Sequence, residues 1–267
     1  MLKILVLLVT QIWSIAFANI EVIQQFDQQQ YSPAKYGLKD LTFEIRVENL
    51  EQDIKKRFSI DQIKDLHFKV YWLTPGRTAI EVHGLPTGFE ALRNELKKIV
   101  VERIEYVVPQ DMATRLRSYD FKLEKNSNGQ TVLNGTDKTS HNVINQIQLV
   151  FDRENQLRSM KTTSPSGSNT ATFKASEMPW SHSKKVVREV ALSGVMGLQK
   201  TNVVTKLDYV AIDGFGFPAG IESITKVTAM TNQDEKSTNE MSSKMTFSSY
   251  KINDGSARKY FMELDAQ

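Results

Sequence analysis

The sequence predicts a mainly β protein with few helices, built on a single antiparallel sheet that curls on itself. Runs of alternating apolar and polar residues recur along the chain, and turn residues separate them at regular intervals. Only one long stretch carries apolar residues at helical spacing. Regular alternation of strands and helices would instead favour a parallel α/β fold.

The first 18 residues have the pattern of a secretory signal peptide. Lys3 precedes an apolar stretch over residues 4–15, and Ala16-Phe17-Ala18 supplies the small-x-small ending. The stretch is shorter than the roughly 20 apolar residues of a membrane-spanning helix. We therefore expect cleavage after Ala18 rather than an uncleaved membrane anchor, leaving residues 19–267 as the mature protein.

The chain contains no cysteine, which excludes a disulfide framework, a thiol nucleophile and a thiolate metal site. This composition suits a bacterial periplasm better than a small secreted eukaryotic domain. A lipid-anchored bacterial lipoprotein needs cysteine at its first mature position, where this chain has Asn19. We expect a periplasmic protein without a lipid anchor. The net charge of +3, with no basic cluster, argues against nucleic acid as a partner.

The N-terminal third predicts a short helix, a strand and a hairpin. Residues 20–30 have an amphipathic helical pattern that ends before Pro33, because the residue preceding a proline avoids the helical region. Residues 41–47 alternate as a half-buried strand. Residues 66–72 and 80–82 form a hairpin around Pro75-Gly76.

The rest of the chain predicts one long helix and a meander. The helix covers 89–107 and ends before Pro109. Two Ser/Thr-rich stretches, 162–172 and 231–243, are expected to be solvated hairpin loops, and without a linker residues 19–267 form one domain. The expected strands are 119–123, 131–133, 147–151, 157–160, 170–173, 185–193, 202–212, 221–231 and 241–252.

Motifs of catalysis are missing, so we expect neither an enzyme nor a metal or cofactor site. The sequence lacks G-x-S-x-G, a glycine-rich phosphate loop and H-E-x-x-H. Glu51 with Asp53, and Asp234 with Glu235, lie in charged segments rather than in the apolar pocket that separates carboxylate pKa values. The four histidines have no patterned partners and are interpreted as surface residues: His67, His83, His141 and His182.

Bulky apolar residues gather on one face of the expected strands. Aromatic and methionine side chains close a packed core in most β domains, but they also line adaptable cavities. Periodicity alone leaves both readings open. The residues are Phe43, Phe68, Trp72, Tyr119, Phe121, Phe151, Tyr209, Met241, Met245 and Phe247.

Three segments resemble the LolA/LolB lipoprotein-carrier superfamily. Residues 68–77, with Trp72 and the Pro75-Gly76-Arg77 ending, are similar to its hairpin of aromatic residues followed by Pro-Gly-Arg. Residues 151–157 are similar to its apolar-Asp-x-x-Asn-x-Leu turn. Tyr209 followed by residues 213–218 is similar to its C-terminal hairpin, so the likeness spans about 20–253. The helix over 89–107 is longer than the family's usual lid element.

The resemblance implies an incomplete, half β-barrel capped by helices, with an apolar groove that holds the acyl chains of lipids or lipoproteins. Its implied role is a soluble periplasmic carrier or chaperone, which delivers this cargo to the outer membrane and meets membrane-bound donor or acceptor proteins. The groove residues would be Phe43, Ile45, Phe68, Val70, Trp72, Ile80, Phe121, Phe151, Tyr209, Met245 and Phe247.

A lid over this groove would be formed by the helix at 89–107. The candidates to hold it are Arg46, Arg77, Phe89, Leu92 and Leu96, although for either arginine a surface cation is the slightly favoured interpretation. The alternative function is a sensory or protein-interaction module on the same fold, with a filled interior and no cargo. An enzyme assembled from distant strands ranks last.

Export gives the first prediction. Protein recovered from the periplasm should begin at Asn19, since the small residues Ala16 and Ala18 suit a signal peptidase site. N-terminal sequencing and intact mass measure this directly. A mature chain that retains Lys3 would contradict it.

Overall fold

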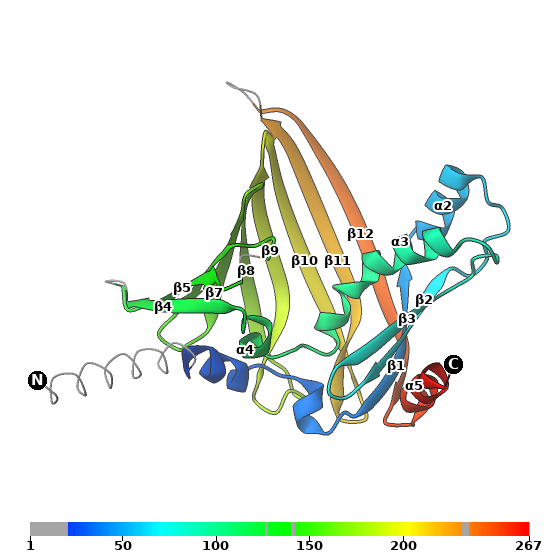
Figure 1. Cartoon of the computed structure of the whole chain (residues 1–267), viewed down its shortest axis with the longest axis horizontal. Coiled ribbons are helices and arrows are strands. Elements are labelled where there is room, and N and C mark those ends of the chain that lie inside the picture. Colours follow the sequence, from blue (N-terminus) through cyan, green and yellow to red (C-terminus); the bar gives the residue numbers. More distant parts are fainter. Residues whose placement is uncertain (1–20, 126–127, 140–141, 231–234, 267) are drawn as a thin grey trace, which may run out of the picture.

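The computed structural model describes residues 21–125, 128–139, 142–230 and 235–266 (Figure 1). The signal-peptide prediction lies outside these residues. Residues 21–29 are helical, in agreement with the helix expected at 20–30. The other helical segments are η1 (Pro33–Tyr36), α2 (Leu50–Phe58), α3 (Glu90–Val101), η2 (Ile104–Tyr106), α4 (Met112–Arg115) and α5 (Ser256–Asp265).

Twelve strands form one antiparallel sheet in the order β3-β2-β1-β12-β11-β10-β9-β8-β7-β6-β5-β4. Each expected strand is present. The strands are β1 (Asp40–Val47), β2 (His67–Leu73), β3 (Arg77–His83), β4 (Tyr119–Lys125), β5 (Thr131–Asp137), β6 (Gln146–Phe151), β7 (Leu157–Ser164), β8 (Gly167–Glu177), β9 (Lys185–Met196), β10 (Gln199–Ile212), β11 (Phe215–Met230) and β12 (Glu235–Ile252).

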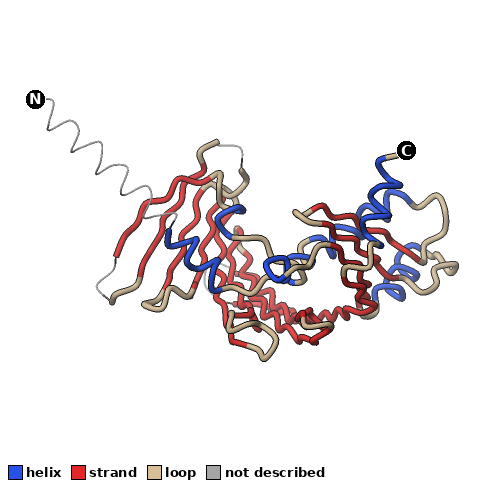
Figure 2. The backbone as a smooth tube through the Cα atoms, turned by 90° about the horizontal axis from the view of Figure 1, so that it is seen from below, coloured by secondary structure: helices blue, strands red, loops and turns tan. Residues whose placement is uncertain are grey.

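The sheet is open, with β3 and β4 at its edges, and it bends into a trough (Figure 2). This confirms the mainly β, antiparallel part of the fold prediction. All strand neighbours but one follow each other in the chain. The exception is β1 with β12, which places Ile45 opposite Phe247 and Val47 opposite Met245. That pairing joins the N-terminal hairpin to the long meander.

Two hydrophobic clusters fill the helix-covered face of the sheet. The first packs Phe43, Ile45 and Phe68 of β1 and β2 with residues of β10 to β12 and beneath α2, α3 and η2. The second packs Leu133 and Leu149 beneath residues 21–29 and α4. Because side chains alternate along a strand, Tyr71 points to the opposite face, where Phe261 of α5 covers it.

The long helix is shorter than its apolar spacing predicts. Hydrogen bonds of the i to i+3 type follow α3, from the Arg103 amide to the Val100 carbonyl and from the Tyr106 amide to the Arg103 carbonyl. The chain thereby tightens into η2 and still buries Ile104 and Val107. Pro109 would in any case end a helix here.

The prediction of loops at the Ser/Thr-rich stretches is wrong for the residues that the structure describes. β7 continues to Ser164 and β8 begins at Gly167, while β12 already begins at Glu235. Thr162 and Thr163 pair with neighbours in β6 and β8, so the sheet satisfies their backbone groups. Polar side chains are compatible with strands here because this end of the sheet extends beyond the packed clusters.

The β1–β12 pairing predicts a graded loss of stability at Ile45, which is fully buried. Ile45→Val should lower the free energy of unfolding by about 0.5–1.5 kcal/mol and Ile45→Ala by about 2–5 kcal/mol, because the larger truncation leaves the larger cavity. Equilibrium urea unfolding measures both. Equal and small effects of the two variants would show that this pairing does not depend on packing at Ile45.

Candidate functional site

A continuous row of side chains crosses the helix-covered face of the long strands. Directly paired residues of neighbouring strands point to the same face, and the pairing runs without a break from β7 to β12. Met160 also pairs with Leu149 of the second cluster, which identifies the face. We call these residues the inner row: Met160, Ala171, Leu192, Val203, Thr225 and Met241.

The inner row is only partly covered. Ala171 is buried, Leu192 and Val203 are half-buried, and Met241 is 57% exposed. Among the residues described, Leu192 and Val203 belong to neither hydrophobic cluster. They therefore form an apolar surface between the two packed regions.

Polar side chains lie on both sides of the inner row at β10 to β12. Toward the clusters, Thr205 and Ser223 are buried and share a hydroxyl hydrogen bond of 2.9 Å; on β9 the same row continues with the apolar Val190. Toward the strand ends, the next row contains Thr201 and Asn239, which pair with Val227 of β11. A ligand on the inner row would therefore meet both polar and apolar neighbours, and the buried hydroxyls beside it are already satisfied.

The predicted groove residues lie in packed cores. Phe121 and Phe151 belong to the second cluster, where Phe121 lies so close over Gly135 that a Cβ there would be 2.6 Å from its ring. The others belong to the first cluster: Phe43, Ile45, Phe68, Val70, Trp72, Ile80, Tyr209, Met245 and Phe247. The structure thus separates the predicted set into two groups, and their role in binding acyl chains stays a prediction.

The helix α3 lies over part of this set. Leu96 is buried in the first cluster and Leu92 packs against it, while Phe89 immediately precedes the helix. The helix contacts β3, the strand of Ile80, and shares the first cluster with Phe68 and Val70. An acyl chain would enter this cluster only if its packing opened.

The two arginines have partners outside α3. Arg77 forms hydrogen bonds of 2.7 and 2.5 Å with the carboxylate of Asp265 on α5, and its guanidinium lies 4.3 Å from the centre of the Phe261 ring. Arg46 donates to Asp65 at 2.6 Å. In this structure Arg77 therefore holds the C-terminal helix rather than the predicted lid.

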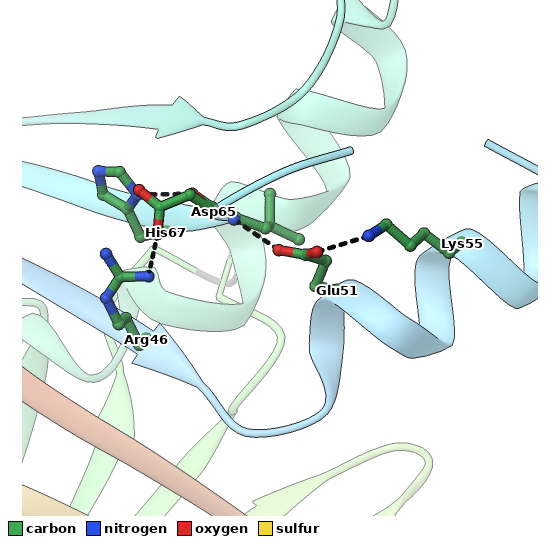
Figure 3. A network of polar contacts seen from close by, with 6 residues as sticks. Arg46, Glu51, Lys55, Asp65 and His67 are labelled. Carbon is green, nitrogen blue, oxygen red and sulfur yellow. Dashed lines mark hydrogen bonds and ion pairs between the residues drawn. The ribbon is translucent and has the colours of Figure 1, made fainter. Parts of the chain in front are cut away.

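Arg46 belongs to a polar network around the start of β2 (Figure 3). The hydrogen bond from Arg46 lowers the pKa of Asp65. Glu51 of α2 accepts hydrogen bonds from Lys55 at 2.7 Å and from the Leu66 amide at 3.0 Å, and these bonds lower its pKa. The network fixes α2 to the segment that enters β2, so the Glu51 carboxylate has a structural role.

The histidines that the structure describes form stacking contacts. His67 pairs with His83 across β2 and β3 with ring centres 5.0 Å apart, and His182 stacks on Tyr36. The His67 side chain is only 15% exposed, so its interpretation as a solvated residue is wrong. His141 lies outside the described residues. Within those residues, His, Asp and Glu side chains form no cluster of three suited to a metal ion.

Tyrosine hydroxyls beside the first cluster are also satisfied. The Tyr209 hydroxyl donates to the Val187 carbonyl at 3.0 Å, and the Tyr250 hydroxyl donates to the Pro218 carbonyl at 2.6 Å. Burial raises the pKa of both groups. They remain neutral donors, which leaves the inner face without a charge or a proton acceptor at these positions.

Sequence reasoning missed Leu192 and Val203 as surface residues. Both lie in correctly predicted strands, but which face they share with Met160 depends on strand register. The signal that could have found them is their alternation with polar neighbours, Ser193 and Asn202.

Among the described helices, none combines the length and the apolar character needed to cross a membrane. Comparison of the chain with protein-family models, with curated proteins and with solved structures found no match.

Proposed function

We propose that this protein is an exported, non-enzymatic carrier that holds an acyl chain on the inner row of its sheet. The observation that carries the proposal is the half-buried apolar strip between the two hydrophobic clusters. The resemblance to the LolA/LolB superfamily and the predicted signal peptide support it, and both remain predictions. The cargo class is a lipid or a lipid-modified protein.

The size of the inner row suits one acyl chain. It crosses from β7 to β12, which at about 4.8 Å per strand spacing corresponds to about 24 Å. An acyl chain occupies half of a bilayer core about 30 Å thick and so spans about 15 Å there. Removing each methylene from water contributes about 0.8 kcal/mol. A chain lying along Leu192 and Val203 therefore has both the room and the driving force to bind.

The helix α3 gives this carrier a way to change its capacity. Leu92 and Leu96 pack in the same cluster as Phe68 and Val70, so an outward swing of α3 would expose apolar surface of that cluster. With α3 in place, this surface is covered by the helix. The return of α3 would compete with any part of the cargo that had moved onto this surface and would lower the affinity for that part.

A second candidate is a protein-interaction module with a filled interior. The dense packing of the predicted groove residues, including fully buried Phe68 and Phe151, favours it. Such a module would recruit a partner through an edge strand, either β3 or β4. Native mass spectrometry of protein purified from its own compartment separates the candidates, since a carrier retains acyl adducts and a module does not.

Two adjacent residues of β10 provide a matched test of the inner row. Val203 pairs with Leu192 on the inner face, whereas Val204 pairs with Ala191 on the opposite face and is 37% exposed. Val203→Asp should weaken binding of a fluorescent fatty acid at least about tenfold, because the carboxylate loses hydration beside the chain. Val204→Asp, with the same change in charge, should leave binding unchanged.

Uptake is measured by fluorescence titration of delipidated protein, and circular dichroism verifies that both variants are folded. A folded wild-type protein that takes up no fatty acid would refute the carrier function. Equal loss in Val203→Asp and Val204→Asp would refute the inner row as the site. Phe68→Asp is less informative, because Phe68 is fully buried and its replacement would unfold the core.

A further inference from the structure

The hairpin between β9 and β10 ends in large apolar side chains that point into solvent. Val195, Met196 and Leu198 are 45%, 63% and 65% exposed. Met196 pairs with Gln199, which leaves Gly197 and Leu198 as a two-residue turn. Gly197 has φ +57°, a conformation that glycine adopts at the first position of such turns. We call residues 195–198 the apolar tip.

Other hairpin turns of the same sheet consist of the polar, proline and glycine residues that are expected in solvent-exposed turns. Pro165-Ser166 connects β7 to β8, and Asp213-Gly214 connects β10 to β11. The turn between β6 and β7 begins at Asp152, whose side chain accepts hydrogen bonds from two backbone amides. Turn geometry alone therefore does not require Met196 and Leu198, because a polar residue would fit each position.

The apolar tip lies at the end of β9, beyond the strip proposed to hold cargo. Leu192, Gly194 and Met196 alternate along β9 on the same face, so Met196 faces the same side of the sheet as the inner row, four residues further along the strand. In Figure 1 the β9–β10 strands rise to the upper end of the sheet, away from α4 and α5. Lys200 follows the tip at the start of β10.

We propose that the apolar tip inserts into the headgroup region of a lipid bilayer, with Lys200 beside the headgroups of anionic lipids. This proposal rests on the proposed carrier function. It identifies the membrane itself as the surface from which the cargo is taken or to which it is delivered. A specific protein interface buries about 800 Å² on each partner, which three side chains on a narrow hairpin cannot supply. A bilayer sets no such minimum and accepts a small apolar projection reversibly.

The chain offers a matched control for this proposal. Met262 and Leu264 on α5 are also exposed, at 68% and 47%. The double variant Met196→Ser with Leu198→Ser removes the apolar tip, and Met262→Ser with Leu264→Ser removes the same residue types elsewhere. Flotation with vesicles of phosphatidylcholine and phosphatidylglycerol should show partitioning lowered at least about tenfold for the tip variant only.

The absence of cysteine permits a second readout. Leu198→Cys carries the only thiol and accepts an environment-sensitive dye, whose emission should shift to the blue when vesicles are added. Met262→Cys with the same dye should not respond. Equal flotation of the tip variant and the wild type, or equal dye responses at the two positions, would overturn the proposal.

Fatty-acid uptake without vesicles keeps the two proposals distinguishable. A tip variant that still takes up fatty acid but no longer floats supports membrane contact by the tip. Wild-type protein that takes up fatty acid but never floats refutes membrane insertion by the apolar tip and leaves the carrier function standing. Wild-type protein that floats through the tip but takes up no fatty acid refutes the carrier function and leaves the tip as a membrane contact.

Discussion

The pairing of β1 with β12 is the constraint on which the rest of the structure depends. Every other strand pair joins strands that follow each other in the chain, whereas this one brings Ile45 to Phe247 across most of the chain. Closing so long a loop costs conformational entropy that grows slowly with its length. Buried side chains on both strands offset this cost, and Asn253 accepts hydrogen bonds from the Lys39 and Asp40 amides at the start of β1.

Once this pairing forms, the two ends of the chain support each other. Asp40, at the first position of β1, accepts hydrogen bonds from the Ala257 and Arg258 amides and so caps α5. Capping satisfies amide groups that a helix N-terminus leaves unpaired. The helix then covers the outer face of β2 through Phe261. Helix α3 packs on the inner face, so the region around β2 and β3 is covered by a helix on both sides.

The same hydrophobic effect has two outcomes on the inner face. Near β1 to β3 and near β4 to β6, helices cover the apolar side chains and the clusters stabilise the fold. Between them, Leu192 and Val203 have apolar neighbours in the sheet but belong to neither cluster. The free energy available from covering them is the physical basis for the proposed cargo site. Extending the strands beyond the clusters also places Met196 and Leu198 in solvent.

Local pattern predicted the strands well. Alternation marked β1 because Leu41, Phe43 and Ile45 face one side, and the turn at Pro75-Gly76 placed the β2–β3 hairpin correctly. The short helices α2 and α5 were missed. The apolar residues of α2 are only Leu50, Ile54 and Phe58, and the cap of α5 comes from Asp40, more than 200 residues earlier in the chain. A helix whose N-terminal amides bond to a distant side chain has no complete local signal.

The sequence by itself determined a cysteine-free, antiparallel β chain with apolar side chains on alternate positions, because these properties follow from composition and from a period of two. Only the tertiary structure decided which apolar residues are packed and which are accessible. The same alternation places Phe68 inside the first cluster and leaves Val203 half-buried outside both clusters. The difference arises from strand register and from where the helices lie, and both depend on contacts between segments far apart in the chain.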